Sequence, residues 1–274
     1  MQTKRSKVTE QDVERWTNKW LKLREEGVYK PWLEVREVPS KGRSRKVKGI
    51  KMDHTHHFLS DLEYHTYLLL EFDPAVTGIY DQYPLLPRDD SIIIANELGI
   101  RHPVYPQSST PIVLTTDFLF DYESPSGNVK RKGISVKPQS ELNIEKKGTR
   151  RTLHKMELEK MVNAKNDIEL KCVTEKSINK NMIYNLKWFI QDAVIDAKLD
   201  EVNNTWLPCF KEKVILSDSK LIDLLKLVAK NISIRYEDSV RLYRHNMWNQ
   251  NLKTDLDKKI QLTDDTGLHK YSYN

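Results

Sequence analysis

Asp117 and Lys137 are the residues whose types and setting best suit a chemical role. Asp117 lies in an apolar run, residues 112–120, that predicts a strand, and residues 133–138 predict a second short strand around Lys137. Turn-forming residues at 123–128 separate the two runs, so a hairpin would bring Asp117 near Lys137. A carboxylate can hold a divalent cation while an ammonium stabilises developing charge or orients water, which suits metal-assisted hydrolysis of a phosphodiester. Such Asp–Lys spacings are common, however, and a hairpin with two surface charges explains the pattern more simply.

Ser135 and Glu63 are further candidates. Side chains alternate along a strand, so Ser135 is predicted to share a face with Lys137. Ser60 and Glu63 form an S-x-x-E capping box at the start of a helix predicted over residues 60–72. Capping explains a glutamate at this position, so the local pattern requires no chemistry of Glu63.

His54, His56 and His57 raise the question of a zinc site. No second ligand pair stands at a zinc-site spacing, so we expect contacts with DNA backbone or packing against the following helix instead. Cys172 and Cys209 are too few and too far apart for a disulfide framework or a cysteine-based zinc site. Cys172 lies in an apolar run and is expected to be a buried thiol.

Composition indicates a globular protein with a well-solvated surface. The chain has 274 residues, of which 38% are hydrophobic and 31% charged. It contains no apolar run long enough to span a membrane and no apolar signal core near Met1. We therefore expect a cytoplasmic protein with no membrane partner.

Positive charge is concentrated in blocks on either side of an acidic region, residues 61–98. The formal net charge is +6, and the first basic block, residues 39–52, contains no acid and is expected to form a loop. The cations of this block are predicted to bind DNA phosphates without contacting bases specifically. They are Lys41, Arg43, Arg45, Lys46, Lys48 and Lys51. Carboxylates between cationic blocks suit a nuclease, although an ordinary solvated surface can carry similar charges.

Periodicity predicts a mixed α/β domain followed by a mostly helical one. Besides the hairpin, the first part contains expected helices at 9–27, 60–72, 91–98 and 149–165, and expected strands at 76–83 and 168–173. The pattern loosens around 174–180, which places the predicted domains at residues 1–178 and 179–274. Helices predicted at 182–197, 220–230 and 237–248, with weak strand character at 252–262, would suit a winged-helix-like module.

The order and spacing of several short segments in the first domain resemble those of a known protein family. They are residues 31–33 (PWL), 37–40 (EVPS), 42–44 (GRS), 56–57 (HH), 59–63 (LSDLE), 82–87 (QYPLLP), 116–119 (TDFL), 136–138 (VKP), 151–153 (RTL) and 158–159 (LE). Together they resemble the TnsA endonuclease subunit of heteromeric cut-and-paste transposons. Residues after about 179 resemble that family much less.

The resemblance implies a restriction-endonuclease-like fold and an active site of the PD-(D/E)xK type. Its helical glutamate, strand aspartate and strand lysine correspond to Glu63, Asp117 and Lys137, with Mg²⁺, or alternatively Mn²⁺, held by Glu63 and Asp117. The family usually has glutamine two residues before the lysine. This chain departs from that pattern with Ser135, whose side chain has a shorter reach but can still hydrogen-bond a metal-bound water.

The same resemblance implies a substrate and partners. The substrate would be the double-stranded DNA of transposon ends, cut at the 5′ ends of the element. A DDE transposase, TnsB, would process the 3′ ends, and an AAA+ regulator, TnsC, would engage the C-terminal domain. Two alternatives remain open at this point, namely a stand-alone restriction or repair nuclease of the same fold, and a non-catalytic adaptor that bridges transposase and regulator.

Overall fold

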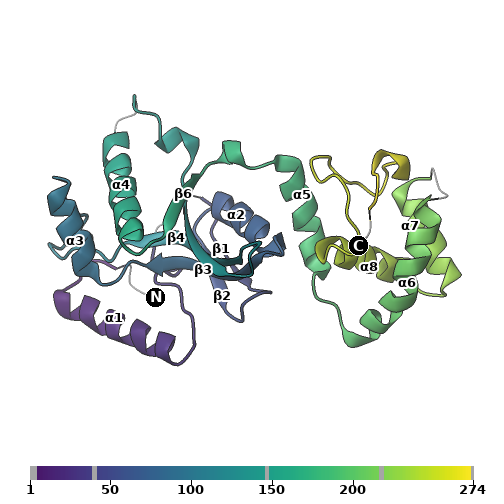
Figure 1. The fold of residues 1–274 in the computed structure, drawn as a ribbon, viewed down its shortest axis with the longest axis horizontal. Coiled ribbons are helices and arrows are strands. Elements are labelled where there is room, and N and C mark those ends of the chain that lie inside the picture. The colour runs from purple at the N-terminus through teal and green to yellow at the C-terminus, as the bar shows by residue number, and fades with distance from the viewer. Residues whose placement is uncertain (1–4, 39–41, 146–147, 216–218, 273–274) are drawn as a thin grey trace. The chain divides into compact units, whose positions relative to one another are not determined.

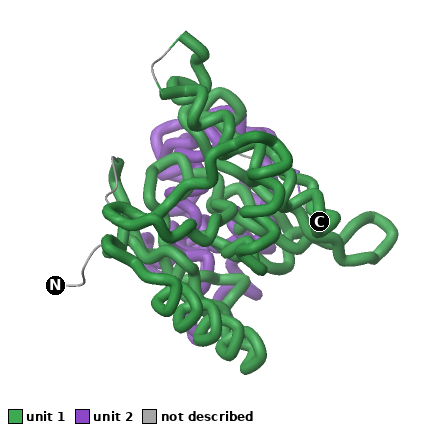
Figure 2. Tube along the Cα trace, turned by 90° about the vertical axis from the view of Figure 1, so that its left-hand side faces the viewer, with its two compact units in different colours: residues 1–178 green, residues 179–274 purple. Residues whose placement is uncertain are grey.

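The chain folds as two compact units, residues 1–178 and 179–274, which Figure 2 colours separately. The computed structural model describes residues 5–38, 42–145, 148–215 and 219–272, so Lys41 of the first basic block lies outside the described residues. None of the helices in these parts is long and apolar enough to cross a bilayer.

A four-stranded mixed sheet forms the centre of the first unit, in the order β3-β4-β5-β6. The first two strand pairs are antiparallel, whereas β5 and β6 run parallel. The strands are β3 (Val76–Pro84), β4 (Thr115–Glu123), β5 (Val129–Val136) and β6 (Glu169–Val173). The predicted hairpin is confirmed as β4 and β5, with Phe118 opposite Ile134. A parallel neighbour requires a crossover, and helix α4 (Thr149–Lys165) supplies it.

Helices cover both faces of this sheet (Figure 1). Ser135 and Ile134 are neighbours on β5 and therefore point to opposite faces. Ser135 contacts α4, whereas Phe118, the cross-strand partner of Ile134, packs against Phe58. Phe58 ends strand β2 (Thr55–Phe58), which lies beside helix α2 (Asp61–Phe72). Buried Leu158 and the apolar residues around it hold α4 against α3 (Arg88–Glu97).

The N-terminal part of the first unit combines one predicted helix with one element that was not predicted. Helix α1 (Glu10–Glu25) begins at the expected Thr9–Asp12 capping box. Strand β1 (Arg45–Lys48) occupies the first basic block, where a loop was expected, and pairs antiparallel with β2. That expectation was wrong because the side chain of Arg45 is partly buried and not directed into solvent. It pairs with Asp61 and stacks on Tyr64, with Cζ 4.2 Å from the ring centroid.

The second unit is helical. Its helices are α5 (Lys180–Phe189), α6 (Ala197–Ile215), α7 (Leu221–Asn231) and α8 (Tyr236–Trp248), and they enclose fully buried Trp206, Phe210 and Tyr243. Single 3₁₀ turns complete the chain at Gln139–Glu141, Glu175–Ser177, Ile190–Asp192 and Thr266–Leu268. Helix α6 was not predicted, and the helix expected at 182–197 ends at Phe189. The strand expected at 252–262 is absent from these described residues, which form turns and loops instead.

The prediction of a buried Cys172 was also wrong. Cys172 is exposed and lies on β6, the last strand in the sheet order. An edge strand is covered less completely than a central one, so an apolar sequence there does not ensure burial.

We expect a chain truncated after Ile178 to fold on its own, because the first unit contains a complete sheet with helices on both faces. The measurement is thermal unfolding of the truncated and full chains, followed by near-ultraviolet circular dichroism. A cooperative transition is the expected result. Loss of that transition on truncation would show that the two units share one stabilising core.

Candidate active site

Asp117 and Lys137 come together because the hairpin and its parallel neighbour fix both backbones. Lys137 continues the β5–β6 ladder by donating its backbone N–H to Val173 O at 3.0 Å. Its Nζ donates to Asp117 Oδ2 at 2.9 Å, and the backbone N–H of Val136 donates to the same oxygen at 2.7 Å. Desolvation opposes the charged ammonium, but the carboxylates of Asp117, Glu159 and Glu63 outweigh it and raise the pKa of Lys137.

Glu63 lies in the first turn of helix α2 and belongs to this charge cluster. Its backbone N–H donates to Ser60 Oγ at 3.1 Å, while its carboxylate accepts from Ser60 Oγ at 2.9 Å and from Leu59 N at 2.9 Å. Ser60 is therefore the N-cap of α2, but the Glu63 carboxylate accepts from the backbone of Leu59 and not from that of Ser60, so the predicted capping box is formed only in part. Burial and the nearby charge of Asp117 raise the pKa of Glu63 to about 7. Capping alone does not require the Glu63 carboxyl to be buried beside a second acid.

Glu159 is a third acid at the site, and residue-by-residue reasoning missed it as a candidate. It projects from α4 and accepts a hydrogen bond from Ser135 Oγ at 3.0 Å through Oε2. Its other oxygen, Oε1, is buried and has no hydrogen-bond partner among the described residues. Burial and the charge of Asp117 raise the pKa of Glu159 to about 7. The available signal was an acid directly after Leu158, at the core-facing side of a predicted helix.

Gln82 connects α2 to the sheet and was likewise missed. Its Nε2 donates to Glu63 Oε2 at 3.3 Å, and its Oε1 accepts from Thr115 Oγ1 at 3.5 Å. Its φ of 49° lies in the left-handed region although it is a buried non-glycine residue inside a strand. Backbone strain of this kind persists where the surroundings hold the residue in place, and it is concentrated at functional sites.

Gln82, Asp117, Lys137 and Glu159 line a cavity of about 800 Å³ in the first unit, and Glu63 is hydrogen-bonded to Gln82 of this lining. Its polar lining includes Gln82, Asp117, Lys137, Arg151, Lys155 and Glu159. Buried carboxylates beside an ammonium can bind a hard cation, polarise water and stabilise negative charge, which is the requirement of phosphodiester hydrolysis.

Comparison with known proteins decides the family. The profile described as "TnsA-like endonuclease N terminal" matches residues 73–175, a range that contains Asp117, Ser135, Lys137 and Glu159. The chain is 35% identical over 209 residues to the transposon Tn7 transposition protein TnsA of Escherichia coli, covering 76% of this chain and 71% of that protein. The chain belongs to the TnsA family. It is a DNA endonuclease with a role in transposition, as the resemblance of its short segments implied.

Membership in the TnsA family implies a divalent metal ion, and the residues at the cavity fit one. Glu63, Asp117 and Glu159 offer carboxylate oxygens, the ligands that hard divalent cations prefer. The unpartnered Oε1 of Glu159 supports the fit, because a buried acceptor without a partner is costly in a finished hydrogen-bond network. The site therefore has more carboxylate oxygens than hydrogen-bond donors to satisfy them.

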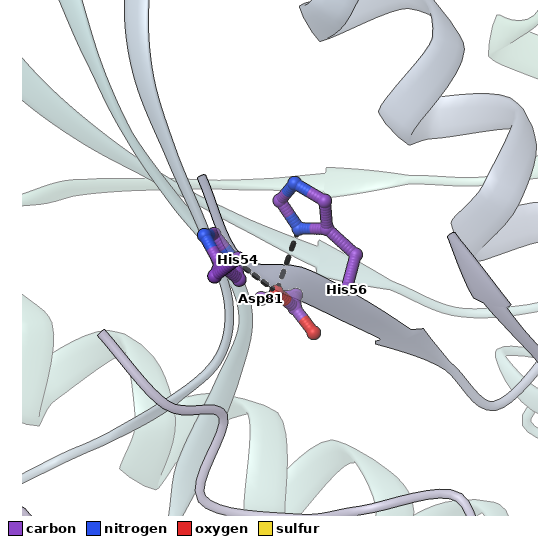
Figure 3. A group of neighbouring side chains, drawn as sticks. All are labelled: His54, His56 and Asp81. Carbon is purple, nitrogen blue, oxygen red and sulfur yellow. Dashed lines mark hydrogen bonds and ion pairs between the residues drawn. The ribbon is translucent and has the colours of Figure 1, made fainter. Parts of the chain in front are cut away.

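The histidine cluster of this TnsA-family chain forms a separate buried network, shown in Figure 3. His54 Nε2 and His56 Nδ1 lie 3.0 and 2.7 Å from Asp81 Oδ1, and the backbone N–H of His57 donates to Asp81 Oδ2 at 2.7 Å. The three ligand-type side chains are close enough to form a metal group. However, the second ring nitrogens of His54 and His56 lack partners within the described residues, whereas metal-binding histidines usually donate from theirs. The structure supports the expectation that the histidines pack against the following helix, because the ring centroids of His56 and Tyr67 of α2 are 4.7 Å apart.

Glu159→Gln should stabilise the metal-free protein at high pH. A carboxyl whose folded pKa is about 7, above its ordinary 4.5, holds its proton in the folded state between these values, so stability falls as pH rises through this window. The glutamine amide of the variant does not ionise, so the stability of the variant does not fall in this pH window. We expect the variant to gain on the order of 1 kcal/mol over the unmodified chain at about pH 8, and little at about pH 5.

The measurement is urea unfolding in EDTA at both pH values. Glu157→Gln is the matched control, because Glu157 lies on the same helix but is exposed. Equal gains at both pH values, or equal behaviour of the two variants, would contradict a proton held by Glu159.

Proposed function

We propose that this TnsA-family endonuclease hydrolyses one phosphodiester at each 5′ end of a transposon, using Glu63, Asp117 and Lys137. The observation that carries the proposal is the 2.9 Å contact between Lys137 Nζ and Asp117 Oδ2 at a cavity that Glu159 also lines. Glu63 is hydrogen-bonded to Gln82 of the same lining, and both glutamates have raised pKa values. A helical glutamate, a strand aspartate and a lysine just beyond a strand are the PD-(D/E)xK set that the resemblance implies.

Mg²⁺ is the proposed cofactor, held by Glu63 and Asp117, with Mn²⁺ as a substitute. When bound, the ion would supply a Lewis acid that lowers the pKa of water and neutralises charge on the leaving oxygen. Lys137 would orient the attacking water or stabilise charge on the phosphoryl oxygens. Glu159 Oε1 has no partner in the described part of the chain, and the pKa of this carboxyl, about 7, suits it to accept the proton of that water.

Ser135 is proposed to act through Glu159 at the position where the family usually has glutamine. Its hydroxyl donates to Glu159 Oε2, so the serine orients the acid on α4. The longer carboxylate of Glu159 would then supply the oxygen that a glutamine side chain would otherwise bring to the centre.

The second unit is proposed to bind partners. Residues 179–274 form their own compact unit, and the resemblance assigns contact with an AAA+ regulator, TnsC, to this part. A DDE transposase, TnsB, would process the 3′ ends and supply site choice on double-stranded transposon-end DNA. A winged-helix-like character and residence in the cytoplasm remain predictions, as does phosphate binding by the described basic residues Arg43, Arg45, Lys46 and Lys48.

Asp117→Ala should abolish 5′ nicking, because the variant loses both a metal ligand and the acceptor for Lys137. Folding should survive, since Asp117 is only partly buried. The assay measures nicking of labelled transposon ends by the full chain with the partner transposase present. Near-normal nicking would remove Asp117 from the active site, and a nuclease that cuts alone with its own sequence preference would show a stand-alone enzyme.

Lys137→Ala should separate chemistry from metal binding. Loss of the ammonium should reduce single-turnover nicking by orders of magnitude, whereas Mg²⁺ affinity should persist or rise because a neighbouring positive charge repels a cation. Glu63→Gln should weaken both metal binding and nicking, since the amide carries no charge. If Glu63 only caps α2, this variant would instead lose about 1 kcal/mol of stability at most and keep its activity. Nicking rates and calorimetric Mg²⁺ affinities of both variants distinguish these outcomes.

A further inference from the structure

One face of helix α4 presents three charged residues to the cavity. Arg151, Lys155 and Glu159 are spaced by four residues, which places them one above another on the same side of the helix, and all three line the cavity. Leu158 and Val162 are buried in the core and fix how the helix is turned. The packing of these two neighbouring side chains therefore fixes the direction in which the charged residues point.

Arg151 and Lys155 form no ion pair with a carboxylate in the described ranges, unlike other cations at the same cavity. Lys137 is paired with Asp117 at 2.9 Å and Arg5 with Glu37 at 3.0 Å. Desolvation beside the cavity lowers the pKa of Lys155, and so does repulsion from Lys137 and Arg151. Since the side chain as a whole remains exposed, an anion arriving from solvent could reach it and relieve this repulsion.

The first turn of α4 adds to the positive potential. It contains no acidic residue, and its N-cap, Gly148, provides no side chain to satisfy the free backbone N–H groups. The positive end of the helix dipole thus points toward the end of the helix that carries Arg151. Two cations without an ion pair in the described residues therefore line the cavity close to the positive end of this helix.

We propose that Arg151 and Lys155 form a phosphate-binding subsite for the DNA backbone next to the scissile phosphate. The proposal rests on the proposed function, because it takes Asp117 and Lys137 as the place where the scissile phosphate lies. Four residues of helix advance about 6 Å along its axis, which is comparable to the distance between successive phosphates of one strand. Lys155 would contact the first phosphate beyond the reacting one, and Arg151 the second.

The subsite positions DNA and takes no part in bond breaking. It would hold the strand in register with the carboxylates, so its loss should weaken substrate binding in the absence of any cleavage. This separates it from Lys137, whose removal should slow chemistry. It also assigns phosphate binding to the wall of the active site, in addition to the first basic block, where Arg45 already pairs with Asp61.

The first test measures binding of the full chain to a fluorescent transposon-end duplex in EDTA, by anisotropy at several salt concentrations. Lys155→Ala and Arg151→Ala should each weaken binding about 3- to 10-fold and reduce the slope of log K against log salt by about one. Lys160→Ala is the matched control, because Lys160 is an exposed lysine of the same helix that does not line the cavity. It should leave the slope unchanged, and Lys155→Arg should keep near-normal binding.

The second test replaces single phosphates of the duplex by uncharged methylphosphonates. The unmodified protein should lose affinity when the phosphate next to the scissile one is replaced, whereas Lys155→Ala should show no further loss at that position. Equal slopes for Lys155→Ala and Lys160→Ala would overturn the proposal. So would a methylphosphonate profile that Lys155→Ala leaves unchanged, or an unmodified chain that does not bind the duplex at low salt.

Both tests are independent of catalysis. Asp117→Ala should show the same methylphosphonate profile as the unmodified chain, because its phosphate contacts remain. Normal nicking by Asp117→Ala would therefore refute the catalytic assignment while the binding profile still decides the subsite. The converse result, a correct catalytic assignment with no effect of Lys155→Ala, would refute the subsite alone.

Discussion

Charge balance among the buried carboxylates and Lys137 at the active site is the constraint on which the first unit depends. Glu63, Asp117 and Glu159 influence one another there, and like charges in a low-dielectric setting are costly unless protons or cations compensate them. Lys137 provides one fixed positive charge, held against Asp117. Without a bound metal, the two glutamates are balanced by retaining protons near neutral pH. Arg151 and Lys155 line the cavity but form no ion pair with these carboxylates in the described residues, so a divalent cation bound among the acids would balance their charge.

The division of labour between sheet and helices follows from the need for fixed geometry. Asp117 and Lys137 come from adjacent strands, where backbone hydrogen bonds define their separation. The two glutamates come from helices on different faces, and each is oriented by a hydroxyl, from Ser60 or Ser135. Groups whose supporting contacts are themselves fixed need little reorganisation during reaction. The strained backbone of Gln82 lies at the junction of these two parts.

Sequence reasoning succeeded where the determinants are local. Helix α4 and the β4–β5 hairpin have strong periodicity and turn residues, so their existence and the proximity of Asp117 to Lys137 followed directly. Glu159 escaped because its position depends on the parallel pairing of β5 with β6, which no local pattern encodes. Helix α6 escaped because Pro208 and its polar residues obscure the period. Strand β1 escaped because its charged residues read as a loop until Asp61 and Tyr64 are seen beside Arg45.

The parallel pairing of β5 with β6 also has a consequence for the ribosome. The backbone of Lys137 is fixed by Val173 O, and β6 follows the whole of α4 in the chain. During synthesis, Glu63, Asp117 and Lys137 therefore leave the exit tunnel before β6, the strand that fixes the backbone of Lys137. Domains fold as units once their sequence has emerged, and long-range parallel pairing forms late. A nascent polypeptide whose β6 has not yet emerged therefore lacks the backbone contact that fixes Lys137.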